Sequence, residues 1–555
     1  MDQLSLDGFE TSVDACQTSM SHLTFLAGNR ASSNGKDPIR RATGRFYTPE
    51  LIGRHLARRV AGHLPQGRNI LLIDPFCGDG RLIEWLLDFA TGTEGRWRVA
   101  LWDSDAEAVP RAVERVRAAA RRARRHVRVE PFVGDTFARA ADIDATYDVV
   151  MTNPPWELLK PDRREIAHLS QEHAADYVSA LRAFDARLVR AYPAAQPSRR
   201  FAGWGTNLAR VGTDAALRLL APGGVCGVVS PSSLFADSNS ERLRRRIFDE
   251  FDVDEIAYYP AEARLFDGVD VPCATFVARR RQGYRVAPRL TRFTPQARPE
   301  QSRRIAFSRA VLAESGFVLP IAFGATGIAL LSELASRGFP RFRELEAEGT
   351  VWAGRELDET RKERYLASTG EHAFLKGVNI RRFGICRAPT QYVDPEHVRL
   401  PSTVRYPRLA WRDVSRPNQR RRVQATLIPP GWVTGNSLGV AHLRNGDDLV
   451  ALSALLAILS SIPFEYQLRS ILSTGHVSLS SVRQVRLPRL DPASVRVLGK
   501  LAVEAMDGSE SAEQILEVEA ARAYGIDREE WALMLGEFSK LTDKETNALL
   551  AAWDR

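Results

Sequence analysis

The stretch "LLIDPFCGDGRLIEWLL", residues 71–87, joins a short apolar run, a turn with two glycines and apolar residues at helical spacing. These features predict a buried strand, a tight turn and a helix. In a doubly wound sheet, this first turn lies at the carboxyl ends of the strands, where ligands bind. Gly78 and Gly80 would let the backbone approach a ligand closely, and the Asp74 carboxylate could accept a hydrogen bond from an amine. An ordinary strand-to-helix turn shows the same pattern, so the turn alone does not establish a ligand site.

Strands and helices alternate on both sides of this turn. A helix is expected directly after Thr48, with Thr48 as its cap and Pro49 in its first turn. The alternation predicts an α/β fold with a doubly wound sheet of seven strands. The strands are expected at residues 69–76, 98–105, 127–135, 147–153, 223–231, 254–260 and 273–280.

Carboxylates end two further expected strands. Asp103 ends the second strand and Asp135 ends the third. In nucleoside-binding sheets, an acidic side chain at the first of these positions binds the ribose hydroxyls. Together with Asp74, these side chains suit a nucleoside that carries cationic groups better than a pyrophosphate. The pattern GxxxxGK[ST] is absent from the sequence, which excludes a P-loop.

The segment "MTNPPWELL", residues 151–159, ends the fourth expected strand with two prolines, which cannot continue a central strand. The side-chain oxygen of Asn153 and the carbonyl of Pro154 can accept the two hydrogens of an exocyclic amine on a base. Two such acceptors favour a tetrahedral nitrogen whose lone pair attacks a methyl group, by positioning and electrostatic stabilisation. Pro155 stiffens the turn, and Trp156 can stack on an extruded base. A plain turn is the alternative, but the position directly after the fourth strand favours catalysis.

The order of these pieces resembles the gamma-class amino-methyltransferases of DNA, the adenine-N6 modification enzymes that use S-adenosylmethionine. "GRFYTPE" (44–50), "DPFCGDGR" (74–81), "NPPW" (153–156) and a C-terminal recognition region follow one another as in that class. The resemblance covers roughly residues 44–490 and is strongest over 44–280. It implies a seven-stranded, Rossmann-like methyltransferase sheet followed by a mixed α+β target-recognition domain for double-stranded DNA.

The resemblance also assigns cofactor residues. Thr48 matches the residue at the methionine carboxylate, Asp103 the ribose ligand, and Asp135 the residue near the cofactor adenine amine. Asp79 stands where the family usually has a small residue, which leaves the contacts of the cofactor loop open. The positions that match this loop are Asp74, Phe76, Gly78 and Gly80.

A second aromatic residue is assigned by the same resemblance. Phe266, within "ARLFDGVDVPCATF" (263–276), resembles the aromatic side chain that faces the flipped base beside Trp156. A phenylalanine of the core is the alternative.

The net charge of +9 is unevenly distributed, because residues 281–490 carry 32 Arg and Lys against 17 Asp and Glu. A basic block of this kind favours a module that binds a polyanion. Segments 374–384, 407–440 and 455–490 resemble target-recognition domains of Type I and Type IIG-like enzymes. In them, the cluster Arg420–Arg422 (Arg420, Arg421 and Arg422) is predicted to contact DNA phosphates while nearby polar side chains read base edges. A solvated charged loop is the alternative for any single arginine.

Composition limits the remaining possibilities. The five cysteines form no CxxC pair, which predicts a reduced, cytoplasmic protein without a structural metal. No apolar run approaches the roughly 20 residues that span a bilayer, so no membrane partner is expected. The expected division is a flexible N-terminal arm (1–40), a catalytic domain (41–285), a target-recognition domain (286–495) and a helical tail (496–555).

The sequence therefore predicts a site-specific DNA adenine-N6 methyltransferase that flips its target base and serves as the modification part of a restriction-modification or phage-defence system. The alternatives are cytosine-N4 methylation, methylation of a protein glutamine amide, and a catalytically silent DNA-binding subunit. None of the seven lysines has an acidic residue two positions before it, so no Asp/Glu-x-Lys nuclease element occurs. Any DNA cleavage is expected from a separate restriction nuclease or defence-system subunit.

Overall fold

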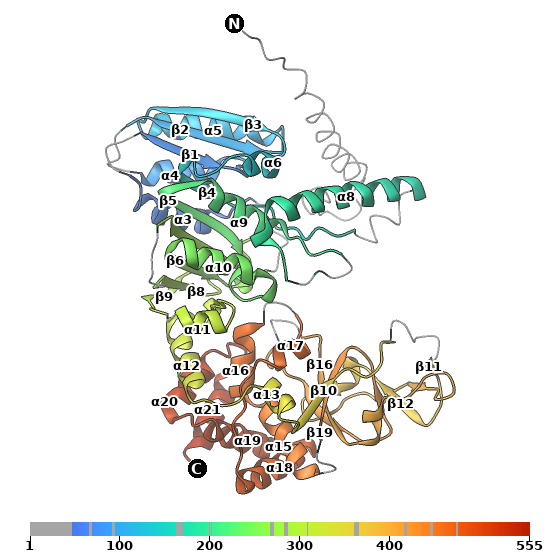
Figure 1. Ribbon diagram of the computed structural model, residues 1–555. Helices are drawn as coiled ribbons and strands as arrows, with labels where there is room; N and C mark the ends of the chain where they lie inside the picture. The colour runs from blue at the N-terminus through green and yellow to red at the C-terminus, as the bar shows by residue number, and fades with distance from the viewer. Residues whose placement is uncertain are drawn as a thin grey trace. The chain divides into compact units, whose positions relative to one another are not determined.

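The computed structural model describes two compact units, Met1–Ala325 and Thr326–Arg555 (Figure 1). The expected N-terminal arm, residues 1–40, lies outside the described residues. The described residues are 47–65, 69–90, 95–161, 170–198, 200, 203–266, 271–281, 287–307, 309–359, 366–415, 419–444, 448–472 and 475–555.

The first unit is built on one mixed sheet, which has nine strands among the described residues, in the order β3-β2-β1-β4-β5-β7-β6-β8-β9. The strands from β3 to β5 in this order run parallel to one another, whereas β7 is antiparallel to both β5 and β6. The α/β prediction is confirmed. The strands are β1 (Ile70–Asp74), β2 (Trp97–Asp103), β3 (Val127–Val133), β4 (Tyr147–Thr152), β5 (Leu220–Pro231), β6 (Asp252–Tyr259), β7 (Cys273–Arg279), β8 (Arg289–Phe293) and β9 (Pro299–Arg304).

A strand occurs in each of the seven expected ranges, but the predicted total of seven is wrong because β8 and β9 extend the sheet. The sequence of β9, "PEQSRR", is polar and mostly exposed, as is common for a strand at the edge of a sheet. Such a strand lacks the apolar alternation that marks a half-buried one. The boundary expected after residue 285 therefore falls inside the first unit.

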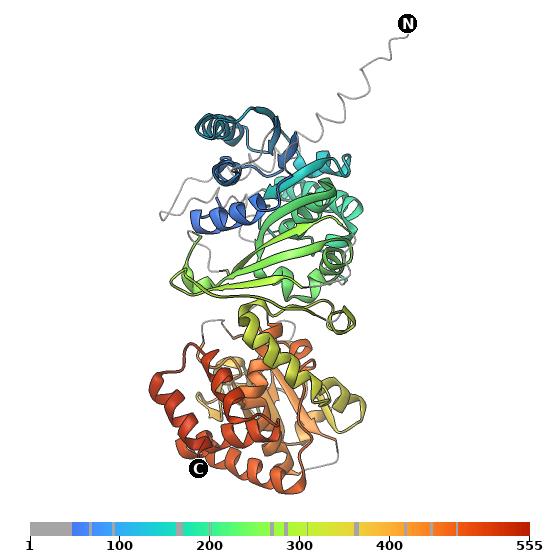
Figure 2. The same ribbon diagram turned by 90° about the vertical axis from the view of Figure 1, so that its left-hand side faces the viewer.

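Helices lie on both sides of this sheet (Figure 2). One apolar core joins helices α3, α4 and α5 to the sheet, with Leu56, Leu72 and Leu86 among its buried residues. Helix α9 packs against β4 and β5. The helices of this unit are α3 (Glu50–Ala61), α4 (Arg81–Phe89), α5 (Ala108–Arg122), α6 (Thr136–Ala141), α8 (Gln171–Ala191), α9 (Leu208–Leu219), α10 (Glu241–Glu250) and α11 (Arg309–Glu314).

The start of α3 differs from the prediction. Pro49 is the N-cap residue, and no side chain caps the helix, so the predicted capping role of Thr48 is wrong. Pro49 has φ −60° and ψ 145°, an extended conformation that places the first helical residue at Glu50. Thr48 consequently lies one residue outside the helix, where its buried side chain is 4% exposed.

The second unit combines small sheets with helices. One four-stranded sheet has the order β10-β19-β16-β17, another has the order β11-β15-β12-β18, and β13 and β14 form a separate pair. The strands are β10 (Val351–Gly354), β11 (Leu366–Ala367), β12 (His372–Leu375), β13 (Ile380–Arg381), β14 (Gly384–Ile385), β15 (Gln391–Val393), β16 (Arg408–Arg412), β17 (Ala425–Ile428), β18 (Val433–Thr434) and β19 (Leu438–Leu443).

The helices at the C-terminus are part of this unit. Helix α18 packs against α15 and α19, and α16 packs against α19 and α20, so the expected tail at 496–555 is joined to helices that begin at residue 449. Within the described residues, no single helix is long and apolar enough to cross a membrane; only the pair α15 and α16, bent by 55°, meets that test together. The helices are α12 (Gly324–Ser336), α13 (Phe342–Ala347), α15 (Leu449–Ser460), α16 (Ile462–Ile471), α17 (Leu479–Val482), α18 (Pro492–Met506), α19 (Glu510–Ala523), α20 (Arg528–Gly536) and α21 (Asp543–Trp553).

Candidate active site

The glycine turn after β1 is bonded to the end of β2. The backbone N–H of Gly78 donates to Oδ2 of Asp103 at 2.8 Å, and the N–H of Cys77 donates to the carbonyl of Trp102 at 2.9 Å. Gly78 and Gly80 have φ of 48° and 80°, a left-handed conformation that favours glycine. A Cβ on Gly80 would also lie 2.8 Å from Cα of Ala112 in α5. Both glycines are therefore required by the shape of the turn.

Asp103 is the predicted ribose ligand and lies at the centre of this arrangement. Its second carboxylate oxygen accepts the backbone N–H of Asp105 at 3.0 Å. A carboxylate oxygen can accept more than one hydrogen bond, and the side chain of Asp103 is partly exposed. The geometry thus fixes the carboxylate without closing it to a ligand.

Asp74, expected to accept a hydrogen bond from a ligand amine, is fully buried at the end of β1. One of its oxygens accepts the N–H of Phe76 at 3.1 Å. Burial raises the pKa of Asp74 to about 7; the Thr152 hydroxyl and the Phe76 N–H oppose this rise, and nearby Asp103 and Asp79 add to it. In this structure the buried Asp74 side chain stabilises the glycine turn through its hydrogen bond with the Phe76 N–H.

Asp79, the residue that departs from the family pattern, points into a cluster of charges. Its carboxylate binds the guanidinium of Arg81 at 2.7 Å and that of Arg115 at 3.3 Å. Arg115 also donates to the Asp79 carbonyl at 2.8 Å and to Glu84 at 2.9 Å. The acidic side chain is therefore accommodated by two arginines, which the sequence pattern did not reveal.

Asp135 is expected to end the third strand, but β3 ends at Val133 and Asp135 is the N-cap residue of α6, with its carboxylate engaged within the protein. One oxygen caps α6 by accepting the N–H of Ala138 at 3.0 Å, and the other pairs with Arg187 of α8. Phe76 and Phe137 contact each other nearby, with ring centroids 4.9 Å apart. A contact between Asp135 and a cofactor adenine stays a prediction.

The Asn-Pro-Pro-Trp turn follows β4, whose neighbours are β1 and β5. The structure brings Trp156 against Phe266, with ring centroids 4.9 Å apart and ring planes tilted by 55°. Both rings pack on the core of the first unit; Phe266 is 6% exposed. The predicted pair of aromatic residues is thus adjacent, although a core role for Phe266 fits the same burial.

The chain after this turn is held by the segment that leads into α9. The N–H of Leu159 donates to the Thr206 carbonyl at 2.9 Å, and the N–H of Leu208 donates to the Glu157 carbonyl at 2.8 Å. The side chain of Asn207 caps α9 by accepting from the N–H groups of Ala209 and Arg210. Sequence reasoning missed this support because the two segments lie far apart in the chain.

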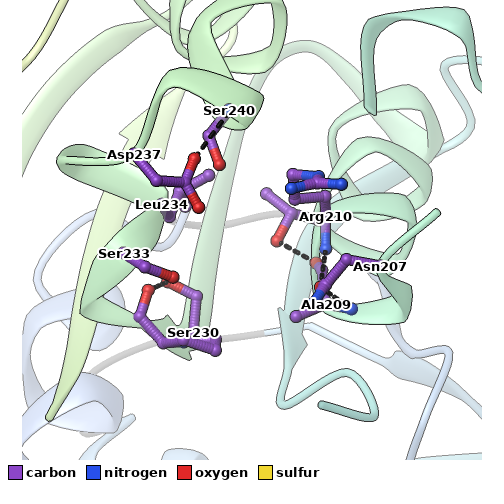
Figure 3. A pocket seen from close by; sticks show the side chains of 10 residues that line it. Asn207, Ala209, Arg210, Ser230, Ser233, Leu234, Asp237 and Ser240 are labelled. Carbon is purple, nitrogen blue, oxygen red and sulfur yellow. Dashed lines mark hydrogen bonds between the residues drawn. The ribbon is translucent and has the colours of Figure 1, made fainter. Parts of the chain in front are cut away.

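A small polar pocket lies at the end of β5, outside the predicted site (Figure 3). Arg210 and Asp237 lie on opposite sides of it; Arg210 donates to the carbonyls of Ala195 and Gly205, and Asp237 accepts the N–H of Ser240. Its volume of about 20 Å³ suits about one water molecule. A nucleoside does not fit there, and none of the predicted site residues lines it.

In the second unit, two of the three predicted phosphate-binding arginines are buried. Arg421 is 7% exposed and binds Glu465 at 3.0 Å and Glu517 at 2.5 Å. Arg422 is 5% exposed and donates to the Ser415 carbonyl at 2.9 Å. The prediction that these two side chains contact DNA is therefore wrong, because their donors face partners inside the protein.

Arg420 differs from its two neighbours. Its side chain is 59% exposed and pairs with Glu545 of α21. A surface ion pair of this kind is weak, so phosphate contact by Arg420 stays a prediction.

Comparison with protein families gives one match. Residues 27–178 match the model described as N-6 DNA Methylase. This match includes the glycine turn, Asp103, Asp135 and the Asn-Pro-Pro-Trp turn, and it supports a DNA methyltransferase that uses S-adenosylmethionine as its cofactor. No curated protein sequence matches the chain.

Solved structures of restriction-modification enzymes show similarity at low identity. The type IIG restriction endonuclease BpuSI has 12% identity and a TM-score of 0.44, covering 93% of this chain and 67% of BpuSI. DrdV in complex with DNA has 13% identity and a TM-score of 0.47, and the match covers 87% of this chain and 59% of DrdV. The Type IIL enzyme MmeI in complex with DNA has 8% identity and a TM-score of 0.46, and the match covers 99% of this chain and 78% of MmeI. At these values the similarities carry no argument about activity.

Proposed function

We propose that this protein is a site-specific DNA methyltransferase that transfers a methyl group from S-adenosylmethionine to the N6 amine of adenine in duplex DNA. The observation that carries the proposal is the adjacency of β1 and β4 in the sheet. This pairing sets the glycine turn, bonded to Asp103, beside the strand that ends in the Asn-Pro-Pro-Trp turn. The proposed nucleoside site and the proposed amine acceptors would thus lie next to each other at the carboxyl ends of the strands, where such sheets bind ligands.

The residues around the glycine turn fit the cofactor. Asp103 would accept the ribose hydroxyls, and the left-handed turn at Gly78 and Gly80 would let the backbone approach the ligand. Thr48 would lie at the methionine carboxylate and Asp135 near the adenine. When bound, the cofactor supplies an activated methyl group on a sulfonium.

The Asn-Pro-Pro-Trp turn would hold the target base. The side-chain oxygen of Asn153 and the carbonyl of Pro154 accept the two amine hydrogens, which directs the nitrogen lone pair towards the methyl group. Pro155 limits the motion of both acceptors. Trp156 offers its ring to a base that has left the duplex, with Phe266 beside it.

Duplex DNA would be recognised by the second unit. The buried Arg421 and Arg422 are not available, whereas several arginines of its β-rich part are exposed and suit phosphate contacts. In this proposal the chain modifies DNA within a restriction-modification or phage-defence system, and any cleavage comes from a separate protein. Exposed arginines of this part, among the described residues, include Arg381, Arg387, Arg399 and Arg405.

Product analysis tests the proposal. Purified protein, S-adenosylmethionine with a labelled methyl group and genomic DNA from a host lacking DNA methyltransferases are incubated, and the DNA is digested to nucleosides for mass spectrometry. Labelled N6-methyladenine is the expected product. Labelled N4-methylcytosine would instead support the cytosine alternative. In a parallel reaction to which a protein extract is added, label in protein and none in DNA would support a glutamine methyltransferase.

A further inference from the structure

Helix α9 contacts the Asn-Pro-Pro-Trp turn at a residue without a side chain. A Cβ placed on Gly212 would lie 2.3 Å from Cβ of Pro154 and 3.1 Å from its Cγ. It would also lie 3.1 Å from Cε2 of Phe76 in the glycine turn. The helix therefore reaches van der Waals contact with both turns only because residue 212 is glycine.

Neither the Pro154 turn nor helix α9 can move away from the other without a large loss of stability. Cβ of Pro154 belongs to a ring that is closed onto the backbone, so it moves only if the turn moves. On the other side, every residue of α9 except Arg218 is buried. The N-terminus of α9 is tied down as well, through the bond from Leu208 to the Glu157 carbonyl and the bonds of Arg210 to Ala195 and Gly205.

Glycine is otherwise a poor choice at this position. It is among the weakest helix formers, and Gly212 lies in the interior of a twelve-residue helix. A buried glycine inside a helix indicates close packing. The close approach of Gly212 to Pro154 explains why a glycine occupies this position.

We propose that Gly212 is a positioning residue for methyl transfer, which braces Pro154 so that the Asn153 oxygen and the Pro154 carbonyl keep their place beside the cofactor turn. The inference rests on the proposed function and extends it to a residue outside both motifs. Gly212 acts through Pro154 and touches no reacting atom. Its effect is therefore on the rate of transfer more than on cofactor affinity.

The test compares Gly212→Ala with two matched variants. Gly227→Ala, in β5, adds the same methyl group within the same unit, but against Cγ2 of Val60 and Cδ1 of Leu56 in the apolar core, 2.6 and 3.0 Å away. Gly536→Ala, at the end of α20, adds it where no atom lies within 4 Å. The readouts are melting temperature, S-adenosylmethionine affinity by calorimetry, single-turnover methyl incorporation into unmethylated genomic DNA, and hydrogen exchange of peptides that cover residues 153–160.

Gly212→Ala is expected to lower the single-turnover rate about 10- to 100-fold, as for a displacement of about 1 Å in a reacting group. The cofactor affinity is expected to change only a few-fold, and hydrogen exchange at residues 153–160 to rise. Gly227→Ala is expected to lower the melting temperature without lowering the single-turnover rate about 10-fold or raising hydrogen exchange at residues 153–160. A wild-type rate and unchanged exchange in Gly212→Ala would overturn the inference.

Two further outcomes separate this inference from the proposed function. If the wild-type protein methylates no DNA, the proposed function fails, while altered exchange in Gly212→Ala alone still supports the brace. If Gly212→Ala fails to fold, Pro154→Gly removes the overlapping Cβ, and the double variant should recover the folded state. Failure of the double variant to recover, or equal costs of Gly212→Ala with and without Pro154→Gly, would contradict the contact.

Discussion

Gly78 donates its backbone N–H to Oδ2 of Asp103 at 2.8 Å, and this bond joins the turn after β1 to the end of β2. The two residues come from separate strand ends that the sheet places side by side. The bond orients the carboxylate from within the protein, so that the same side chain can serve a ligand.

Asp103→Asn should weaken cofactor binding. The amide retains one acceptor oxygen, so it cannot hold both the Gly78 N–H and the Asp105 N–H and also accept the ribose hydroxyls. One of these donors is left unsatisfied, an effect of about 1–3 kcal/mol. Calorimetry with S-adenosylmethionine measures it. Asp142→Asn, an exposed change in the same unit, is the control, and equal affinities for both variants would remove Asp103 from the site.

Asp74 should make stability depend on pH. Its pKa in the folded protein is raised from 3.8 to about 7, so the folded state binds a proton more tightly than the unfolded state does. The associated stability is present at low pH and is lost as pH rises from about 4 to about 7, up to about 4 kcal/mol in total.

The test is a comparison of wild type with Asp74→Asn, which cannot titrate at this position. Between pH 5 and pH 8, the urea midpoint of the first unit should decrease more in the wild type than in Asp74→Asn. Parallel midpoints in the two proteins would show that the Asp74 carboxyl group does not titrate in this range.

The buried charges of the second unit should matter for stability. Glu517 is 3% exposed and binds both Arg382 and Arg421 at 2.5 Å. Glu517→Gln removes one of the two carboxylates that each guanidinium binds, because Arg421 keeps Glu465 and Arg382 keeps Glu513. The expected cost is roughly 1–3 kcal/mol, as for a buried hydrogen-bond partner that is lost.

Glu519→Gln is the matched control, because Glu519 pairs with Arg522 on the surface of the same helix, where an ion pair contributes about 0–1 kcal/mol. Urea unfolding of the second unit measures both variants. Similar midpoints would contradict the role given to the buried cluster. A variant of Arg421 should likewise lose DNA binding only as far as the unit unfolds.

Much of the first unit could be predicted because its signals are local. Apolar runs, turns and strand-end carboxylates are each contained in short stretches, and the strands β1 to β7 lie where those stretches predict them. β8 and β9 could not be found in this way, because exposed edge strands carry no apolar alternation.

The second unit shows where local reasoning fails. The Arg420–Arg422 cluster resembles a phosphate-binding loop, yet Arg421 and Arg422 are buried against Glu465 and carbonyl groups. Burial opposes ionisation of Glu465, but Arg421 and Arg469 outweigh it and hold its pKa below the usual range. The partners come from α16 and α19, and only the folded structure brings them to the cluster.

Single-turnover methyl transfer by Asn153→Ala tests the central claim most directly. Loss of one amine acceptor should lower the rate of N6-methyladenine formation by a factor on the order of 100 or more, with S-adenosylmethionine affinity within a few-fold of wild type. Asn547→Ala, on the exposed surface of α21, should transfer methyl groups at the wild-type rate. A rate for Asn153→Ala equal to that of Asn547→Ala would contradict the role of the Asn-Pro-Pro-Trp turn in methyl transfer.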